Sequence, residues 1–523
     1  MLRFTSLTPY LFVMLTLLAS CSDSDNSSPA PQDTVDSLPS VAQLVTLRPL
    51  SVSEDLRIVD DLDREVLLRG VNLNSLGEYW QGDPNHPPTI AVGMQDWQEM
   101  AARGISVVRL VVNWSKLEPQ RGAISDAYLD EIDETVSIAA AHGIYTVIDM
   151  HQDAFSAFIY TEDADECSPG TQPGKGWDGA PQWATLTDGL STCITGERNS
   201  APAVIAAWNH FYNNTDGIAD RFIAVWGAIA KRFAGRPEVA GYDLLNEPEV
   251  SRPATELQPI FEGIFARAIE TIRQAQEGQQ HSQLIFIEPG IAAAHPEFGL
   301  LVPQLAGVDR HNIVAGPHNY SESIGTGFGW SIEETTDVFL SFANLLGVPI
   351  WVGEYGFWDT SESTVEKAKR YAADQDDNAL GGAQWQWRQA CGDPHSLSWG
   401  GVAVGRVVHL NAVDCPGDVD AGPTEVFMRI LSRTYPRMAP GRITLLHSDS
   451  DTGDFRLEAS IAPADRELIV WSPTYTDTHI IESEGLVNLT SHPVAGGRII
   501  KALTIGGDYT LILSSRPEAV TET

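Results

Sequence analysis

The chain has 523 residues, 43% of them hydrophobic, so it is long enough to bury a large core and to hold a second, smaller domain. It carries 33 Lys and Arg against 70 Asp and Glu, a formal net charge of −37. This excess of negative charge argues against a nucleic-acid partner and against electrostatic docking on anionic lipid. Any membrane association is therefore expected to come from a covalent anchor.

The N-terminus has the pattern of a bacterial export signal. An apolar run over residues 11–18 is too short to span a bilayer and predicts a signal peptide over residues 1–20. The run ends in Leu18-Ala19-Ser20-Cys21, which resembles a lipobox, so Cys21 is expected to carry a lipid anchor. Ser22 after the cysteine favours the outer membrane of the cell envelope. The alternative is an ordinary secretory signal with an incidental cysteine, which predicts a secreted protein.

The segment after the predicted signal and the remaining cysteines fit an exported chain. Residues 21–40 are rich in Ser, Asp and Pro, which predicts a flexible tether. Four cysteines remain in a chain expected to leave the reducing cytosol. Their spacings of 26 and 24 residues favour two local disulfides, Cys167 with Cys193 and Cys391 with Cys415. A zinc site is the alternative, but no CxxC spacing supports it, and we expect no metal.

From residue 41 onward, strand-like apolar runs alternate with amphipathic helices, which predicts a parallel α/β fold. Strands are expected at Val66–Asn72, Ser106–Val112, Tyr145–Met150, Val239–Leu245, Leu284–Ile287, Ile313–Gly316, Ile350–Val352 and Ala383–Trp387. Helices are expected at Asp126–His142, Ala219–Phe233, Leu257–Gln276, Thr335–Leu346 and Thr364–Asp374. Eight strands suffice for a (β/α)8 TIM barrel, which we place at residues 41–438. Short alternating runs over 439–523 predict a small C-terminal antiparallel β-sandwich domain.

Polar residues that are unusual in buried strands cluster in or just after the predicted strands. Barrel enzymes place their sites at the carboxyl ends of the strands, so these residues are expected to converge. The candidates in chain order are Arg109, His151, Asp153, Asn246, Glu247, Glu288, His318, Tyr320, Glu354 and Trp385.

Glu247 and Glu354 follow the predicted fourth and seventh strands, so both are expected to face one barrel mouth. Hydrolysis of a glycosidic bond needs such a pair, one carboxyl protonated and the other ionised. We predict that Arg109 and Tyr320 keep Glu354 ionised as the nucleophile. Repulsion from Glu354 would raise the pKa of Glu247, the predicted acid/base. Asn246 is expected to donate to the sugar 2-hydroxyl, and Trp385 to stack beneath the sugar ring. Only water is required, so we expect no cofactor.

Several motifs of the chain resemble glycoside hydrolase family 5, in the clan of retaining barrel hydrolases. They are Leu68-Arg69-Gly70-Val71-Asn72, Asn246-Glu247-Pro248 and Gly353-Glu354-Tyr355-Gly356, and the resemblance covers roughly residues 41–436. The segments 149–156 and 242–248, with Tyr435-Pro436-Arg437, are similar to the endoglycoceramidase-related branch.

That branch cuts between a sugar or oligosaccharide and ceramide by a double-displacement mechanism. The resemblance implies a glycolipid substrate, with His151 and Asp153 holding the sugar next to the scissile bond. The chain departs from the branch in the loop after strand one. Related enzymes carry a Lys there, whereas this chain has Asn74-Ser75-Leu76-Gly77-Glu78.

The substrate class has alternatives at this stage. Aromatic residues on candidate rim loops fit an apolar trough for a lipid aglycone, but they fit stacking platforms for glucan or mannan chains equally well. They are Phe155, Phe158, Tyr160, Phe328, Trp330, Phe357 and Trp358. A β-glucanase or mannanase acting on polysaccharide is therefore one alternative. A non-catalytic carbohydrate-binding surface lipoprotein is another.

Individual residues also have structural alternatives. Arg109 would serve as a buried ion-pair partner, and His151 and His318 as satisfied core histidines. Asp153 would serve as a helix N-cap. Glu288 is expected to support the site without transferring a proton. Trp387 shares strand parity with Trp385 and is the alternative for the sugar-stacking position.

Overall fold

The structure is a computed structural model that describes residues 38–79, 87–249, 251–289, 305–323, 329–396, 410–415 and 417–515. The predicted signal peptide, Cys21, nearly all of the predicted tether, and Phe328 lie outside the described residues. Within the described part of the chain, no helix is both long enough and apolar enough to cross a membrane.

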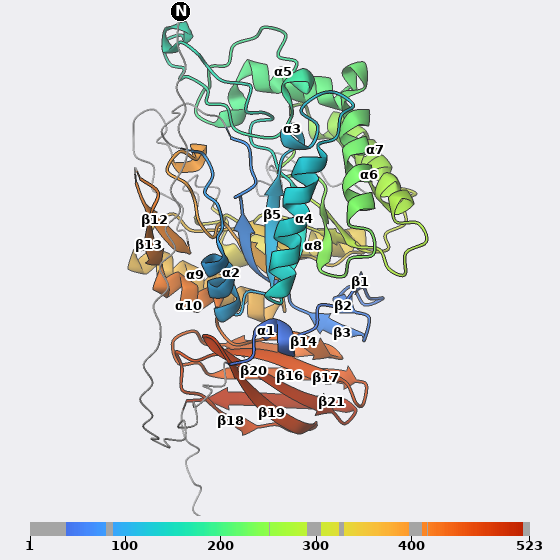
Figure 1. Ribbon diagram of the computed structural model, residues 1–523, viewed down its shortest axis with the longest axis vertical. Helices are drawn as coiled ribbons and strands as arrows, with labels where there is room; N and C mark the ends of the chain where they lie inside the picture. Colours follow the sequence, from blue (N-terminus) through green and yellow to red (C-terminus); the bar gives the residue numbers. More distant parts are fainter. Residues whose placement is uncertain are drawn as a thin grey trace, which may run out of the picture. The chain divides into compact units, whose positions relative to one another are not determined.

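Eight parallel strands form the centre of the fold (Figure 1). They are β4 (Arg69–Leu73), β5 (Val107–Val112), β6 (Tyr145–Met150), β7 (Val239–Asp243), β8 (Leu284–Ile287), β9 (Ile313–Ala315), β10 (Val352–Tyr355) and β11 (Gly382–Gln384). Neighbours pair in the order β10-β11-β4-β5-β6-β7-β8-β9. Parallel bridges from Ala315 to Ile350 and from His318 to Glu354 join β9 to the β10 side. The predicted TIM barrel is confirmed.

The strand boundaries agree best where an apolar run has polar or turn residues at both ends. Strands β6 and β8 have the predicted bounds. The predicted first strand is wrong at its start, because Val66 ends β3 (Arg64–Val66) in a different sheet and the barrel strand begins at Arg69. The predicted seventh strand ended too early, because β10 runs from Val352 to Tyr355 and so includes Glu354. In both cases the apolar run in the sequence and the hydrogen-bonded strand have different ends. The reason is that backbone groups form the strand pairing, and polar residues supply these groups as well as apolar ones.

Helices lie outside the barrel strands (Figure 1). They are α2 (Met94–Ala102), α3 (Trp114–Leu117), α4 (Asp126–Ala141), α5 (Pro202–Tyr212), α6 (Ile218–Arg232), α7 (Ala254–Ala275), α8 (Ile332–Leu346), α9 (Glu362–Asp377) and α10 (Glu425–Leu431), with a short α1 (Val41–Leu44) before the strands. Helix α8 shows how the sequence sets a boundary. Ser331 and Glu334 form a reciprocal capping box at its start, and Gly347 ends it in a left-handed conformation. The five predicted helices are present with shifted ends.

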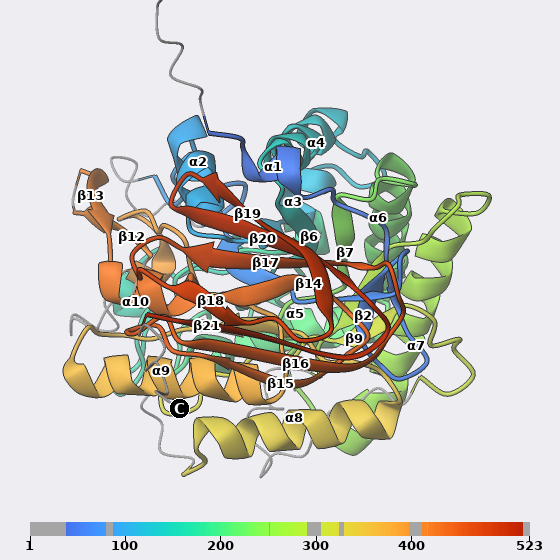
Figure 2. The same ribbon diagram turned by 90° about the horizontal axis from the view of Figure 1, so that it is seen from below.

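Two antiparallel sheets follow the barrel and form the predicted β-sandwich, seen in front of the barrel in Figure 2. The four-stranded sheet has the order β15 (Arg442–Ser448), β16 (Phe455–Ala462), β21 (Gly507–Ser514), β18 (His479–Glu482). The seven-stranded sheet has the order β1 (Leu50–Val52), β2 (Ile58–Asp60), β3, β14 (Tyr435–Pro440), β17 (Glu467–Pro473), β20 (Gly497–Thr504), β19 (Leu486–Val494). Three N-terminal strands thus complete a C-terminal sheet. The domain boundary at residues 438 and 439 stays a prediction.

The sandwich packs against the barrel through one shared hydrophobic core. Trp471 of β17 is fully buried in the same cluster as barrel residues such as Val107 and Phe286. Its Nε1 donates to the Ser432 carbonyl at 3.0 Å. Gly104, before β5, has φ +72°, and a Cβ there would lie 2.3 Å from the Trp471 ring. A glycine is therefore required at residue 104 both for its backbone conformation and for the close approach of the two layers.

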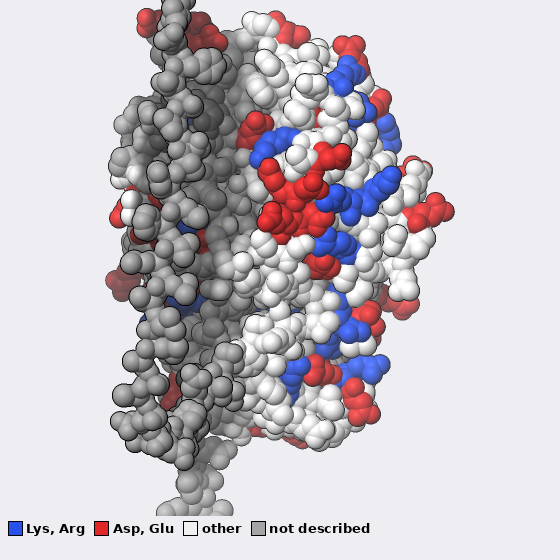
Figure 3. Space-filling model, viewed as in Figure 1, with Lys and Arg blue, Asp and Glu red and all other residues white. Residues whose placement is uncertain are grey.

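Both predicted disulfides are present. Cys167 pairs with Cys193 at a Cα–Cα distance of 5.7 Å, and Cys391 pairs with Cys415 at 5.5 Å. The second bond lies beside the hairpin of β12 (Asn411–Asp414) and β13 (Val419–Pro423). On the described surface in Figure 3, basic side chains lie among the acidic ones, so this face is not uniformly negative despite the net charge of −37.

Candidate active site

The predicted site residues converge at the carboxyl ends of the barrel strands, where Arg109 of β5 is the common contact. Its side chain is fully buried and faces four carboxylates at once. The distances are 2.7 Å from Nη1 to Glu354 Oε1, 2.9 Å from Nε to Asp243 Oδ2, and 2.9 and 3.0 Å from Nη2 to Asp149 Oδ1 and Glu288 Oε1. Arg109 is thus both the predicted partner of Glu354 and the centre of a buried ion-pair network.

The charges of this network shift the pKa values of its members. Burial lowers the pKa of Arg109, but the surrounding carboxylates more than offset it and hold the pKa well above its usual value. Burial raises the pKa of Asp243 to about 6 and that of Glu288 to about 8, although Arg109 and His318 act in the opposite direction. Protonation of Asp243 and Glu288 is therefore easier than protonation of an ordinary carboxyl, because burial disfavours their charged forms more than the neighbouring cations favour them.

Glu354 lies in β10 and is held by the two residues predicted for it. Besides Arg109, the Tyr320 hydroxyl donates to Glu354 Oε2 at 2.9 Å. Glu354 is 5% exposed, so little water competes for these contacts. Two donors therefore fix the positions of both carboxylate oxygens, which orients Glu354 as a nucleophile requires.

Glu247 follows β7 and faces Glu354 across His318. Its backbone has φ +38°, uncommon for a residue other than glycine, and its amide donates to Glu288 Oε2 at 2.7 Å. His318 Nδ1 lies 2.9 Å from Glu247 Oε1 and 3.5 Å from Glu354 Oε2. A carboxylate oxygen of Glu247 and one of Glu354 lie within 4.8 Å of each other.

The direction of the pKa shift at Glu247 differs from the prediction. Burial raises its pKa, but the hydrogen bond and charge of His318, together with the charge of Arg198, outweigh this and lower it. Arg198 Nη2 lies 3.1 Å from Glu247 Oε2. The predicted repulsion from Glu354 is overcome because His318 stands between the two glutamates as a cation. The pKa of His318 lies well above its usual value, since Glu288 and Glu354 outweigh its burial.

A second group of side chains lies beside the two glutamates, on the loops after β6 and β11. His151 Nδ1 is 2.6 Å from Asp149 Oδ2, and its ring stacks on Trp385 with centroids 5.3 Å apart and planes 13° apart. Trp387 is instead buried in the main core, where its Nε1 donates to Asp96 at 3.0 Å. Trp385 is therefore the tryptophan that faces the site.

Asp153 contacts two cations. Arg198 Nη2 is in contact with Asp153 Oδ1, and His395 Nε2 lies 2.9 Å from Asp153 Oδ2. Burial raises the pKa of Asp153, but these two neighbours outweigh it and lower the pKa well below its usual range. No helix in the described residues begins at Asp153, so the N-cap alternative is wrong.

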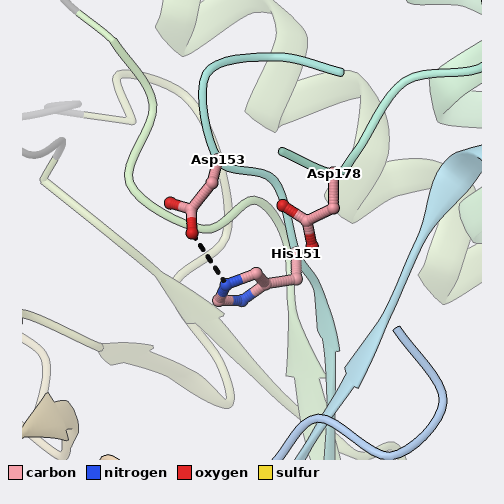
Figure 4. A group of neighbouring side chains, drawn as sticks. All are labelled: His151, Asp153 and Asp178. Atoms are coloured by element: carbon pink, nitrogen blue, oxygen red, sulfur yellow. Dashed lines mark ion pairs between the residues drawn. The ribbon is translucent and has the colours of Figure 1, made fainter. Parts of the chain in front are cut away.

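Two groups of side chains have the composition of a cation site. The first, shown in Figure 4, is His151, Asp153 and Asp178, and the second is Glu247, His318 and Glu354. His151 Nδ1 is already bound by Asp149, while Arg198 and His395 neutralise Asp153. Arg198 and Arg109 likewise contact Glu247 and Glu354 of the second group. A metal ion would have to displace these cations, so both donor sets fit an internal ion-pair network better than a metal centre.

Arg198 and His395 were missed by the sequence reasoning. Arg198 lies 45 and 49 positions from its partners Asp153 and Glu247, and no motif marks it. The one signal was its place in the long cysteine-containing insert after β6, where loop residues reach the barrel mouth. His395 follows β11, and Asp393 Oδ1 fixes its Nδ1 at 2.7 Å.

The loop after β4, where the resemblance implies a Lys, has no cation in residues 74–78. Asn74 Nδ2 donates to Asp393 Oδ2 at 2.8 Å, and the Glu78 amide donates to Asn113. The cations next to Asp153 lie on the β6 insert and on the loop after β11.

The predicted rim aromatics that the structure describes divide into three groups. Phe155 and Phe357 are buried, Phe155 against Trp208 and Phe357 against Phe427, so their assignment to the rim is wrong. Phe158 is 40%, Tyr160 37% and Trp330 36% exposed. Trp358 is partly buried against Trp385 and Val111. Sequence alone does not separate these groups, because the same aromatic residue serves a core or a rim depending on the loop path.

Two glutamates face each other at the mouth of a parallel barrel, one after β7 and one in β10. The first lies beside two cations, and the second is held by an arginine and a tyrosine. This is the arrangement of a barrel glycoside hydrolase. Residues 61–390 match the family model Cellulase (glycosyl hydrolase family 5). The chain belongs to glycosyl hydrolase family 5.

Similarity to individual proteins extends beyond the barrel. The crystal structure of an endogalactoceramidase has 34% sequence identity and a TM-score of 0.80, covering 89% of this chain and 99% of that chain. Endoglycoceramidase I of Rhodococcus hoagii is 26% identical over 500 residues, 89% of this chain and 88% of its own length. The lactosyl-enzyme intermediate of endo-glycoceramidase II from Rhodococcus sp. has 24% identity and a TM-score of 0.66, covering 88% of this chain and 99% of that chain, a likeness of fold. The predicted resemblance to the endoglycoceramidase-related branch is confirmed.

Proposed function

We propose that this chain hydrolyses the β-glycosidic bond between a sugar or oligosaccharide and a lipid aglycone with retention of configuration, with Glu247 as acid/base and Glu354 as nucleophile. The observation that carries the proposal is the separation of the two carboxylates, since one oxygen of Glu247 and one of Glu354 lie within 4.8 Å of each other beside His318. Retaining enzymes place the carboxyl groups about 5–5.5 Å apart, and inverting enzymes about 6.5–9.5 Å apart.

In the first step Glu354 attacks the anomeric carbon while Glu247 gives a proton to the leaving oxygen. The Glu354 carboxylate is oriented by Arg109 at 2.7 Å and by the Tyr320 hydroxyl at 2.9 Å, so one oxygen keeps its partner as the other forms the bond. The products of this step are a glycosyl ester on Glu354 and the free alcohol of the aglycone.

In the second step Glu247 takes a proton from water, which attacks the ester and restores the Glu354 carboxylate. Formation of the ester removes the negative charge of Glu354, so less repulsion then opposes ionisation of Glu247. His318, 2.9 Å from Glu247, favours the same ionised form. The geometry thus favours the base role of Glu247, and the acid role requires a change at one of its contacts.

The sugar lies between the glutamates and the group formed by His151, Asp153 and Trp385. Trp385 offers an indole face for the apolar side of the ring. Asn246 has a fixed amide orientation, since its Oδ1 accepts from Arg109 at 3.0 Å and its Nδ2 donates to the Gln152 carbonyl at 3.0 Å. It is therefore preorganised to donate to the sugar 2-hydroxyl.

A lipid aglycone is supported by two relatives that each match 89% of this chain, one an endogalactoceramidase and one an endoglycoceramidase. The exposed Phe158, Tyr160 and Trp330 supply apolar surface of the kind a lipid chain requires. Export under the predicted signal peptide and a lipid anchor on Cys21 would hold the enzyme at the cell envelope, at the outer membrane. In the secretory alternative the enzyme is released.

A paired assay tests the substrate class. We expect the protein to release free ceramide from a fluorescent glycosphingolipid, with no comparable release of reducing sugar from soluble β-glucan or mannan. Activity on the polysaccharides alone would identify a β-glucanase or mannanase. Sugar binding without hydrolysis of either substrate would identify a non-catalytic carbohydrate-binding protein.

A further inference from the structure

Arg198 joins two loops of the site through one nitrogen. Its Nη2 contacts Asp153 Oδ1 on the loop after β6 and lies 3.1 Å from Glu247 Oε2 on the loop after β7. The guanidinium also lies over the Trp177 ring at 4.7 Å. Arg198 begins a short 3₁₀ helix, Arg198–Ser200, which starts five residues after Cys193 and so adjoins the segment closed by the Cys167–Cys193 bond.

Both oxygens of Glu247 therefore face cations. His318 is 2.9 Å from Oε1, and Arg198 is 3.1 Å from Oε2. A carboxyl that is about to donate a proton needs one oxygen that carries hydrogen and faces an acceptor, the leaving oxygen of the substrate. A donor at each oxygen opposes this state, so one contact must open for the first step.

Arg198 is the contact that can open with less disruption. The His318 side chain is 7% exposed, and its Nε2 lies 2.9 Å from Glu288, so the imidazole is fixed from both sides by carboxylates. The Arg198 side chain is 18% exposed. If it leaves Glu247, it keeps Asp153 and Trp177 as partners, and its charge stays compensated.

We propose that Arg198 is a positioning residue whose bridge between Asp153 and Glu247 sets when Glu247 is protonated: a sugar oxygen bound beside Asp153 accepts from the Arg198 guanidinium in place of Glu247 and so prepares the acid. This inference rests on the proposed role of Glu247. When the bridge opens, Glu247 takes one proton from solvent and then gives it to the aglycone oxygen. When the bridge re-forms, Glu247 is again a carboxylate, ready to accept a proton from the attacking water.

The charged groups that face Glu247 decide whether loss of Arg198 raises or lowers the pKa of Glu247. His318 and Arg198 stabilise its ionised form, while Asp153 and burial oppose it. Glu354 is a further negative neighbour across His318, and Glu288 accepts a hydrogen bond from the Glu247 backbone amide. Of the two cations, only Arg198 also contacts Asp153, so only Arg198 links the sugar position to the acid.

The test is the pH dependence of kcat/KM for Arg198→Met, using a fluorescent glycosphingolipid that the wild-type protein hydrolyses. Activity falls at alkaline pH as the acid loses its proton. Removal of an adjacent cation raises the pKa of the acid, so this limb should move up by about one pH unit or more. Arg198→Lys keeps the charge and should keep the limb near its wild-type position.

Arg121→Met is the matched control. Arg121 also stacks on a tryptophan, with its guanidinium 5.5 Å from the Trp183 ring centroid, but it binds the Asp216 carbonyl and no site carboxylate. The alkaline limb of the kcat/KM profile of Arg121→Met should therefore stay at its wild-type position. Thermal unfolding checks that each variant is folded, and Arg198→Gln replaces the Met variant if that protein does not fold.

The outcomes separate this inference from the proposed function. An unchanged alkaline limb in a folded, neutral Arg198 variant would overturn the role of Arg198, while loss of activity in Glu247→Gln would still support the acid/base assignment. Unchanged activity in Glu247→Gln would overturn both. A limb that moves equally in Arg121→Met and Arg198→Met would mean a nonspecific electrostatic effect and would also overturn the inference.

Discussion

Arg109 Nη1 lies 2.7 Å from Glu354 Oε1, a contact between a fully buried arginine of β5 and the predicted nucleophile of β10. The same guanidinium contacts Asp149, Asp243 and Glu288. The cation that orients the nucleophile thus also neutralises the charges beneath the site. Catalysis and stability are therefore coupled at this position.

Arg109→Met should lower both activity and stability. Glu354 loses its closest donor, so we expect kcat/KM to fall by about 100-fold or more. Removing one member of a buried ion-pair network leaves carboxylates uncompensated and costs about 3–5 kcal/mol of unfolding free energy. Steady-state kinetics and urea unfolding measure the two effects. A loss of activity at unchanged stability would show that the four carboxylates do not depend on Arg109.

His151 should make the stability depend on pH. Its burial lowers the pKa, but Asp149 outweighs this and raises it to about 9 from the ordinary value of about 6.5. The stabilisation by the charged imidazole is fully present below pH 6.5 and is lost as pH rises through 9. Urea unfolding from pH 6 to 10 should show a decline that is smaller in His151→Asn. Parallel declines in the two proteins would mean that His151 is not the titrating group.

Gly104 should tolerate no side chain. A Cβ would lie 2.3 Å from the Trp471 ring, and φ is +72°. We expect Gly104→Ala to cost at least about 2 kcal/mol, because steric overlap between the barrel and the sandwich adds to backbone strain. Gly122→Ala is the control, since φ is +83° there but no atom lies within 4 Å of the added Cβ. Equal costs for the two variants in chemical unfolding would refute the requirement for close packing at Gly104.

Trp385 and Trp387 should differ in what they affect. Trp385 stacks on His151 at the site, whereas Trp387 binds Asp96 in the core. Trp385→Ala should lower kcat/KM at least about 10-fold through lost stacking on the sugar ring, with a smaller change in thermal stability. Trp387→Ala should cost about 3–5 kcal/mol. The reverse pattern would move the sugar platform to Trp387.

The fold and the first contacts of the two glutamates followed from local pattern. Strands β6 and β8 are apolar runs with clear ends, and Arg109, Tyr320, Glu247 and Glu354 each adjoin such a run. The eightfold repeat of strand and helix then places them at one end of a barrel. The residues of the site could be predicted because the barrel topology brings residues that follow different strands together at one end.

Contacts made by long loops could not be predicted in this way. Arg198 reaches Glu247 from an insert whose path depends on a disulfide and on stacking against Trp177. Together with His318, which contributes more, Arg198 lowers the pKa of Glu247, whereas the sequence predicted a raised pKa. Strand β3 pairs with β14, which lies more than 360 residues later in the chain. No local sequence pattern indicates this pairing, because it is formed by backbone groups.

The most direct test of the central claim is covalent trapping of the nucleophile. The protein is incubated with a 2-deoxy-2-fluoro glycoside that has an activated leaving group, and the labelled peptide is identified by mass spectrometry. The fluorine slows both steps, and the activated leaving group keeps formation of the ester faster than its hydrolysis. We predict one sugar per chain, attached to Glu354. A label on another residue, or no label in a preparation that hydrolyses the parent glycoside, would contradict the assignment of Glu354 as the nucleophile.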